Sequence, residues 1–450
     1  MKKSLLLSLL LAVFGISYSQ DSTIIHSPFE GMDFTWLNGN NRQRSNILGV
    51  KNFTGLMIVD TYYNYSFNKP MDNTINTSSI IGRNNEITLN MASIGGEMVY
   101  NNVIARIYLQ TGAMLSVIQE TDPTVNHGRN LRTTDMKFIR EAVAGYQWNK
   151  WNSIRFETGI FMSFIGLESY IAQENWSYQR SMVCDFTPFY FSGARLQIHP
   201  SKKWKIEPWL MNGWYSYGKF NKGSSVGLAT YYRPNENTTF VANFYYGTDT
   251  RNIAGRVRFH HDNTVMIRYK NNPASHGVSR MAFSLNSHYG YEDGGSLNGV
   301  AYPSRSETYF AGTSLANRIW FQENKFAMTL RAGYLTNPGR YLPVNPAPLY
   351  TDPVSGATGY TDIKPGDLAP KFEAWEFTGT FDYMPNEFIT LRAEILNRHS
   401  SVPYFAGPGG TTSVDGWLGT SDPNIGTPQA WKPDLRTLEN RLIFAVIARF

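Results

Sequence analysis

The feature that most limits the fold of this chain is a long series of strand-like segments joined by connections of two lengths. Sixteen segments alternate apolar and polar side chains with a period of two, and most are bounded by Gly, Pro, Asn or Asp. We expect strands at 54–67, 85–99, 102–117, 136–148, 153–164, 187–198, 204–215, 224–232, 238–247, 254–269, 280–291, 307–321, 326–336, 372–383, 388–398 and 438–450. Since no segment keeps a helical period, the pattern predicts an all-β protein.

The connections between these segments alternate in length. Short ones, such as 149–152 and 384–387, alternate with long ones, such as 165–186, 337–371 and 399–437. Antiparallel strands bring every second connection to the same end of a sheet, so the two ends must differ. Outer-membrane barrels have short periplasmic turns, long extracellular loops and an even number of strands. The sequence therefore predicts a transmembrane antiparallel β-barrel of about 16 strands over residues 54–450.

The two faces of the predicted strands also fit a barrel in lipid. In the last segment the apolar Phe444 lies on one face and Arg441 on the other, and lipid must surround a barrel whose apolar side chains point outward. Around Pro208 we expect a bulge, because Glu207 would otherwise face lipid together with Trp209. Aromatic side chains near strand ends would form girdles at the headgroup level. To these girdles we assign Tyr62, Tyr63, Tyr65, Trp148, Trp151, Trp204, Trp209, Tyr245, Tyr246, Trp320, Phe321 and Tyr383.

The N-terminus has the pattern of an export signal. A basic start at Met1 to Lys3 precedes an apolar run over 4–16 and the small residues of a cleavage site before Gln20. We expect 1–19 to be a signal peptide and 20–53 an N-terminal periplasmic segment. Beyond it the longest apolar run, 442–448, is far shorter than the roughly 18 residues of a membrane-spanning helix, which excludes a helical membrane protein.

Several motifs resemble those of the putative beta-barrel porin-2 (OmpL-like) family. They are Asp33 to Trp36, Asp60 to Asn68, Glu157 to Ser169, Asn175-Trp176, Arg180-Ser181, Pro188 to Tyr190, Gly193 and Asn212 to Trp214. The resemblance covers most of the chain after the signal, is strongest from about 54 to 270, and rests on architecture alone in the last third. It implies an outer-membrane channel and transfers no catalytic residues.

Charged side chains on the inward faces are the candidate site residues. By alternation we assign to the pore lining Arg106, Arg155, Arg195, Arg256, Arg258, Arg268, Arg318, Arg331, Arg392, Asp60, Glu141, Glu157 and Glu394. Guanidinium groups pair bidentately with carboxylates, so this set fits a cross-braced wall. Rings of charged side chains also select ions in pores, and the two interpretations are compatible.

One arc of the predicted wall has few carboxylates. The segment 254–269 turns Arg256, Arg258 and Arg268 inward, with Asp262 as the only acid among them. Unpaired guanidinium groups stay charged and would enrich anions in the lumen. We therefore expect a weak preference for anions.

Motifs for catalysis and metal binding are sparse. On a strand His260 and Asp262 share a face while His261 points away, so at most two of these three can meet one metal, which favours a polar wall. The Gly-x-Ser-x-Gly match at 223–227 opens a strand instead of linking a strand to a helix, which favours a loop junction over a nucleophile elbow. We expect no cofactor, no metal and no enzymatic activity.

The predicted function is that of an outer-membrane porin-like channel for passive diffusion of small polar solutes, since barrels of about 16–18 strands leave an aqueous channel. Two alternatives stay open: an outer-membrane enzyme, and a structural or adhesive barrel whose lumen is closed by 337–371 and 399–437. Expected partners are outer-membrane lipid, the barrel-insertion machinery that recognises the last strand with Phe450, and the solutes. Further copies of the chain are also candidates. Nucleic acid is not expected, because basic residues do not cluster.

Overall fold

The structure is a computed structural model. It describes residues 29–44, 46–75, 80–118, 122–124, 131, 133–250, 253, 255–297, 299–342, 350–351, 358–359, 371–411 and 434–450. The predicted signal peptide lies outside the described residues.

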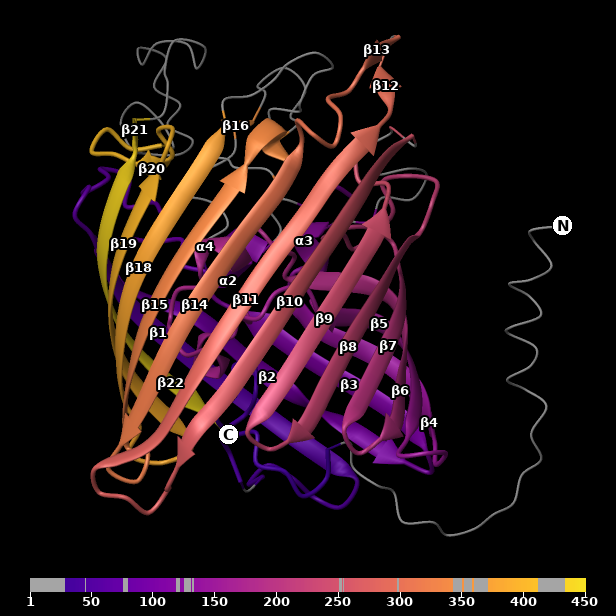
Figure 1. The fold of residues 1–450 in the computed structure, drawn as a ribbon, viewed down its shortest axis with the longest axis vertical. Coiled ribbons are helices and arrows are strands. Elements are labelled where there is room, and N and C mark those ends of the chain that lie inside the picture. The colour runs from indigo at the N-terminus through magenta and orange to yellow at the C-terminus, as the bar shows by residue number, and fades with distance from the viewer. Residues whose placement is uncertain are drawn as a thin grey trace, which may run out of the picture.

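Sixteen antiparallel strands close into one barrel, each pairing with its neighbours in chain order (Figure 1). They are β1 (Phe53–Ser66), β2 (Ile87–Tyr100), β3 (Val103–Thr111), β4 (Ile139–Trp148), β5 (Ile154–Met162), β6 (Tyr190–Ser201), β7 (Trp204–Met211), β8 (Ser225–Asn235), β9 (Thr238–Gly247), β10 (Arg256–Asn271), β11 (Val278–Gly294), β14 (Tyr309–Phe321), β15 (Phe326–Asn337), β18 (Phe372–Tyr383), β19 (Ile389–Ser400) and β22 (Leu438–Arg449). Closure comes from β22 pairing with β1, where Phe444 lies opposite Tyr63. The predicted sixteen-stranded barrel is confirmed.

The remaining elements are short. Three two-stranded hairpins are formed by β12 (Ser296–Leu297) with β13 (Val300–Ala301), β16 (Tyr350–Thr351) with β17 (Thr358–Gly359), and β20 (Phe405–Ala406) with β21 (Leu435–Arg436). The helical turns are α2 (Met114–Ile118), α3 (Thr133–Met136), η1 (Ala172–Glu174), α4 (Met182–Asp185) and η2 (Pro338–Arg340). Among the described residues, none of the helices is long and apolar enough to cross a membrane.

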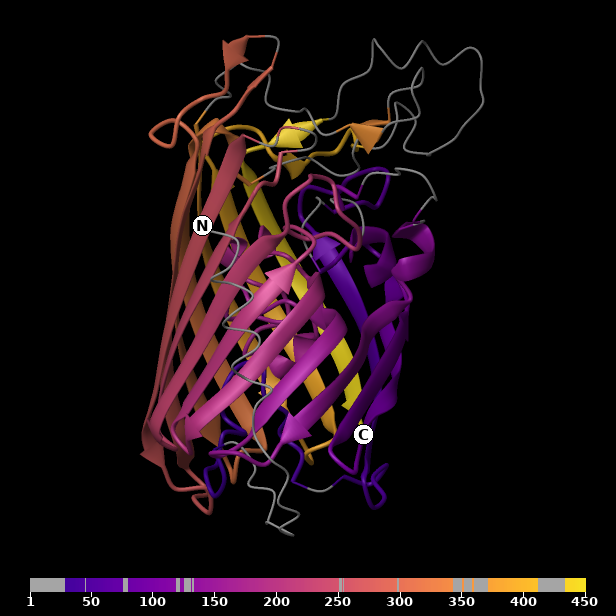
Figure 2. The same cartoon turned by 90° about the vertical axis from the view of Figure 1, so that its right-hand side faces the viewer.

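The two ends of the barrel differ as the connection lengths predict. The hairpins β12–β13 and β20–β21 lie at one end, which we call the loop end (Figure 2). Turns such as 101–102 and 236–237 lie at the opposite end, the turn end, together with the C-terminus. The strand predicted at 102–117 ends earlier than expected. β3 stops at Thr111, and α2 begins at Met114 after Gly112 takes a left-handed φ of +121°.

The outer and inner faces of the wall reverse the pattern of a soluble protein. Apolar side chains such as Ile94 and Phe377 are exposed on the outside, while charged side chains such as Arg256 and Glu376 are buried inside. This distribution needs lipid around the barrel.

The predictions around Pro208 and for part of the aromatic girdle are wrong. β7 pairs with β8 without a register shift, and Glu207 and Trp209 are both buried, because the strand keeps regular alternation and simply turns the tryptophan inward. The register shift lies in β6, between Ile198 and Ser201. Of the predicted girdle residues, the buried ones are Tyr62, Trp209, Tyr245 and Trp320.

Candidate functional site in the barrel lumen

The connection between β5 and β6 folds into the barrel, and we call residues 163–189 the inserted loop. Most of its side chains are buried, and α4 packs against β14, β15 and β18 from inside (Figures 1 and 2). Gly166 begins the inward path with a φ of +88°, and a Cβ there would lie 3.2 Å from Thr187 Oγ1. Its backbone N–H donates to Asp262 on β10 at 3.2 Å. A glycine is thus required where the chain turns into the lumen.

Charged groups of β19 hold the part of the loop over residues 172–179. Glu394 accepts hydrogen bonds from the backbone N–H groups of Tyr178 and Gln179, at 2.6 and 3.0 Å. Arg392 donates to the carbonyl oxygens of Ala172 and Asn175, at 2.9 and 3.0 Å. These bonds satisfy backbone groups of an irregular segment that could otherwise not be buried.

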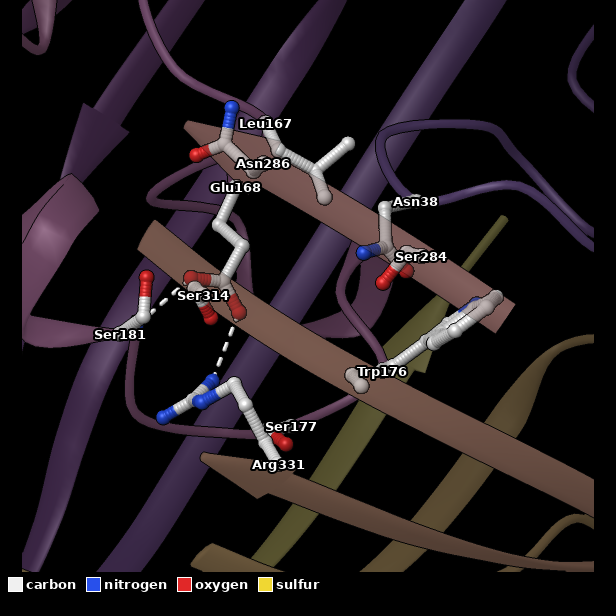
Figure 3. A pocket seen from close by; sticks show the side chains of 11 residues that line it. Asn38, Leu167, Glu168, Trp176, Ser177, Ser181, Ser284, Asn286, Ser314 and Arg331 are labelled. Carbon is white, nitrogen blue, oxygen red and sulfur yellow. Dashed lines mark hydrogen bonds and ion pairs between the residues drawn. The ribbon is translucent and has the colours of Figure 1, made fainter. Parts of the chain in front are cut away.

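Glu168 joins the loop to β15 (Figure 3). Its carboxylate accepts from the Ser181 backbone N–H and from Arg331 Nη1, both at 2.6 Å. Arg331 also donates to the Gln179 carbonyl oxygen at 2.9 Å. Since all these groups are buried, this charge pair fixes the fold of the loop against the wall.

The segment before β1 crosses the turn end of the lumen. Trp36 is buried, and its indole N–H donates to the Glu236 carbonyl oxygen at 2.9 Å in the β8–β9 turn. The indole N–H of Trp176 in the inserted loop donates to the Trp36 carbonyl oxygen at 2.9 Å. Across the barrel, Arg42 donates to Thr390 on β19 at 2.8 Å. The N-terminal segment and the inserted loop therefore occupy the lumen as one connected body.

Asp33 is the main charged contact of that segment. Its carboxylate lies 3.1 Å from Arg268 and 3.0 Å from Arg280. Burial alone would raise the pKa of Asp33, but the Thr35 hydroxyl and the two guanidinium groups outweigh burial and hold it below its ordinary value. The carboxylate is therefore ionised near neutral pH.

A chamber of about 510 Å³ remains between these inserted segments and the wall of β5 to β10. The cationic side chains of its lining are Arg155, Arg180, Lys205 and Arg233, and the acidic ones are Glu168 and Glu174. Both carboxylates are paired with arginines of the opposite wall, Glu168 with Arg331 and Glu174 with Arg449. The chamber is polar, and its lining carries more positive than negative groups.

All thirteen predicted pore-lining residues lie on the inside of the barrel, but most contact other protein groups. On β2 to β6, Arg106 pairs with Glu97 at 2.6 Å and Glu141 at 2.9 Å, while Arg195 pairs with Glu157 at 2.6 Å. Arg155 pairs with Glu97 and lines the chamber. Asp60 accepts from Tyr178 of the inserted loop, and Arg318 pairs with Asp382. A role of any of them in meeting a solute stays a prediction.

The prediction of unpaired arginines on β10 is wrong. Glu292 pairs with Arg256 at 3.0 Å and Arg258 at 2.9 Å. Arg268 pairs with Asp33 and with Glu236 at 2.7 Å. The sequence analysis missed these partners. Glu292 lies just past the predicted end of β11, Glu236 lies in a turn, and Asp33 lies in the N-terminal segment.

Other inner residues could have been found from the sequence. Glu97 and Arg398 lie within predicted strands, and alternation places Arg398 on the same face as Arg392 and Glu394. Asp185 in the inserted loop, which pairs with Arg398 at 3.0 Å, carries no such signal.

Comparison with known families matches residues 52–422 to the family described as putative beta-barrel porin-2, OmpL-like. The chain belongs to this family. Membership in putative beta-barrel porin-2 gives the protein a channel-type role and places it in the bacterial outer membrane.

Several solved structures are similar to this member of putative beta-barrel porin-2. OmpT, an outer membrane protein of Vibrio cholerae, is 9% identical, with 90% of this chain and 100% of that chain covered and a TM-score of 0.49. OprB of Pseudomonas putida is 8% identical, with 89% and 94% covered and a TM-score of 0.49. An anion-selective porin from Comamonas acidovorans is 10% identical, with 88% and 99% covered and a TM-score of 0.47. No curated protein matches the chain by sequence.

Proposed function

We propose that the protein is a diffusion channel for small polar solutes, and that the solute path follows the wall of β5 to β10. The observation that carries this proposal is the polar chamber of about 510 Å³, which is the space left between that wall and the inserted segments. On the opposite side, β14 to β19 bind the loop directly and leave little room for a path.

A weak preference for anions follows from the lining of this chamber and not from β10. Arg233 contacts the rings of Phe29 and Phe34, and its Nε donates to Thr239 at 3.3 Å. Arg180 donates to Thr187 at 2.5 Å. In the described part of the chain neither has a carboxylate within ion-pair distance, so their charge is available to attract anions.

Planar-bilayer recording tests both parts of this proposal. The wild type should conduct, and its reversal potential across a salt gradient should indicate anion preference that fades at high salt. Arg233→Gln should reduce the preference, whereas Arg256→Gln, whose charge is matched by Glu292, should change it less. Equal shifts in the two variants, or cation preference in the wild type, would contradict the assignment.

The orientation and the partners belong to the same proposal. We place the turn end in the periplasm and the loop end outside the cell, as short turns and long loops indicate. Exposed apolar side chains of the wall would contact outer-membrane lipid, and β22 with Phe450 would be recognised by the barrel-insertion machinery. Assembly into oligomers is an additional expectation.

A barrel with a closed lumen is the second candidate function. It is favoured by the inserted loop and the N-terminal segment, which together occupy much of the lumen. The loops that we expected to block it, 337–371 and 399–437, lie largely outside the described residues. The two candidates differ in one measurement, because a closed barrel gives no single-channel steps in a planar bilayer while a channel does.

Enzymatic activity is not part of the proposal. One ring nitrogen of His260 faces one of His288. The other nitrogen of His260 faces Tyr341, and the other nitrogen of His288 faces Asn286. Neither imidazole is therefore directed at a serine. Ser225 of the Gly-x-Ser-x-Gly match accepts a hydrogen bond from Tyr245 at 2.7 Å. An esterase assay on purified barrel would test this expectation.

A further inference from the structure

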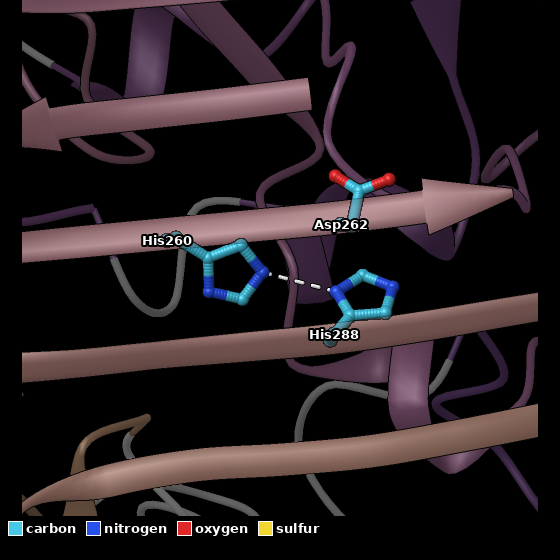
Figure 4. A group of neighbouring side chains, drawn as sticks. All are labelled: His260, Asp262 and His288. Atoms are coloured by element: carbon cyan, nitrogen blue, oxygen red, sulfur yellow. Dashed lines mark hydrogen bonds between the residues drawn. The ribbon is translucent and has the colours of Figure 1, made fainter. Parts of the chain in front are cut away.

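Two histidines and an aspartate from adjacent strands meet inside the wall (Figure 4). His260 and Asp262 lie on β10, and His288 on β11 lies opposite Asp262 in the strand register. One donor atom from each residue lies within 4.8 Å of the other two, and all three residues are buried. His260 Nε2 and His288 Nδ1 point at each other across 3.0 Å. The sequence places His260 and Asp262 on one face, but it does not indicate His288, which is 26 positions from Asp262, its partner in register.

The outer nitrogen of each ring already has an oxygen partner. His288 Nε2 lies 2.8 Å from Asn286 Oδ1, which also accepts from Cys184. The amide NH₂ of Asn286 donates to Asn263 and Thr264, so the oxygen must face the ring and His288 Nε2 must donate. In a neutral imidazole the inner nitrogen, Nδ1, then carries a lone pair.

The second ring has the same arrangement when the Tyr341 hydroxyl donates to the Phe259 carbonyl oxygen at 3.0 Å. His260 Nδ1, 3.0 Å from that hydroxyl, must then donate to it, and His260 Nε2 also carries a lone pair. Two lone pairs facing each other at 3.0 Å repel, so a cation is needed between the rings. The alternative is a single neutral chain in which Tyr341 donates to His260 and His260 donates to His288.

Asp262 is the third group of this cluster. Its carboxylate is fully buried and accepts from the Gly166 N–H at 3.2 Å and from Asn243 at 3.0 Å, both neutral donors. Within the part of the chain that the structure describes, no Lys, Arg or His lies within ion-pair distance of it. An ionised carboxylate in this position needs a cation or a metal, which a cation between the rings supplies, whereas the neutral chain leaves Asp262 stable only in its protonated form.

We propose that His260 Nε2, His288 Nδ1 and the Asp262 carboxylate bind one divalent transition-metal ion. With metal–nitrogen bonds of about 2.0–2.1 Å, nitrogens 3.0 Å apart subtend an angle of about 91–97° at the ion. A right angle and an N,N,O donor set suit tetragonal Cu²⁺ or Ni²⁺, or octahedral ions, better than tetrahedral Zn²⁺. Tyr341 and Asn286 orient the two rings as outer partners usually do.

The ion has a path to this site and a structural effect there. Gly166 and Asn243, the two residues that donate to Asp262, line the chamber, so an ion in the chamber is one side chain away. Because Asp262 also holds Gly166, a bound ion ties the start of the inserted loop to β10 and β11.

Copper binding to the whole refolded barrel tests the site. The protein is prepared without a histidine tag and is treated with chelator before copper is added. The wild type should bind one Cu²⁺ per chain, with an electron paramagnetic resonance spectrum showing coupling to two imidazole nitrogens. His288→Ala and His260→Ala should each lose that two-nitrogen spectrum. Tyr341→Phe should keep it but bind more weakly by about 10-fold, the lower range for loss of an outer partner.

Matched controls separate this site from other histidines. His261→Ala removes the neighbouring imidazole, which stacks on Phe244. His199→Ala removes a histidine of the chamber, and His276→Ala removes an exposed one in a turn. All three should retain the two-nitrogen spectrum. Loss of the signal in any of them, with retention in His288→Ala, would overturn the assignment.

Folding is checked by the heat-modifiable mobility of the barrel on gels. If the histidine variants do not fold, Asp262→Asn and the wild type decide the question, because Asn is a weaker ligand of nearly the same shape. A wild type that takes up neither Cu²⁺ nor Ni²⁺ at one equivalent would mean that a proton fills the gap between the rings, and the proposal would be wrong.

Discussion

Two arcs of the barrel wall carry similar charges but use them differently. On β2 to β6 the carboxylates and arginines pair with one another along the wall, and most of their side chains are 10–22% exposed. On β14 to β19 the paired side chains are at most 5% exposed, and they also bind backbone groups of the inserted loop. The first arc is a braced wall beside the chamber, and the second is a socket for the loop.

The difference shows that inward alternation of charge does not by itself define a pore. Arg155 and Arg392 occupy equivalent inward positions, yet one faces the chamber and the other donates to loop carbonyl oxygens. What separates them is the path of a segment that is distant in sequence.

The largest effect should come from removing the loop. Replacing residues 167–186 by a short Gly-Ser linker empties the socket and joins the chamber to the rest of the lumen. We expect single-channel conductance to rise several-fold while the heat-modifiable folded form persists, because the strand ladder does not depend on the loop. Conductance equal to that of the wild type would show that solutes do not pass where the loop lies.

Next in size is the loss of Asp382, the shared carboxylate of Arg318 and Arg392. It lies 2.6 Å from each guanidinium group and is fully buried. Asp382→Asn leaves two buried arginines without their acid, and breaking such a pair typically costs about 3–5 kcal/mol. We expect a lower denaturant midpoint and faster proteolysis of the inserted loop.

A matched carboxylate-to-amide change on the braced wall should lower the free energy of unfolding much less than Asp382→Asn does. Glu141→Gln removes one of three acids around Arg106, which keeps Glu97 at 2.6 Å and Glu157 at 3.6 Å. Because these groups are partly exposed, we expect a loss below about 1 kcal/mol in the free energy of unfolding. The distinction between the arcs fails if Glu141→Gln is as destabilising as Asp382→Asn.

The sequence predicts the wall far better than what fills it. Period-2 alternation located all sixteen strands, because each strand has one face in lipid and one inside. The inserted loop was treated as an ordinary external connection, although Ile171, Trp176, Val183 and Phe186 are unusually apolar for one. Nothing local could pair Asp33 with Arg268, 235 positions away, because that contact depends on the path of the whole chain.

The smallest predicted effect concerns Asp33, which pairs with arginines of β10 and β11. This third arc of the wall shares one property with each of the other two arcs. As in the socket, the carboxylate belongs to a segment inserted in the lumen. The Asp33 side chain is 30% exposed, however, which is more than the side chains of the braced wall. The pKa of Asp33 is lower than its ordinary value of 3.8 in the folded barrel, so the folded state holds the ionised form more strongly than the unfolded chain does. The stabilisation is therefore present above pH 4 and fades as pH falls through the folded value.

Denaturant midpoints of the wild type and Asp33→Asn, measured from pH 7 down to pH 3, isolate this contribution because the other acids are common to both proteins. The difference should be constant and below about 1 kcal/mol above pH 5, then shrink toward pH 3. If exposure governs the strength of a pair, the difference will resemble that of Glu141→Gln. If attachment of an inserted segment governs the strength of a pair, the difference will approach that of Asp382→Asn. Arg280→Gln should then lower the free energy of unfolding by the same amount as Asp33→Asn, since Arg280 lies 3.0 Å from the same carboxylate.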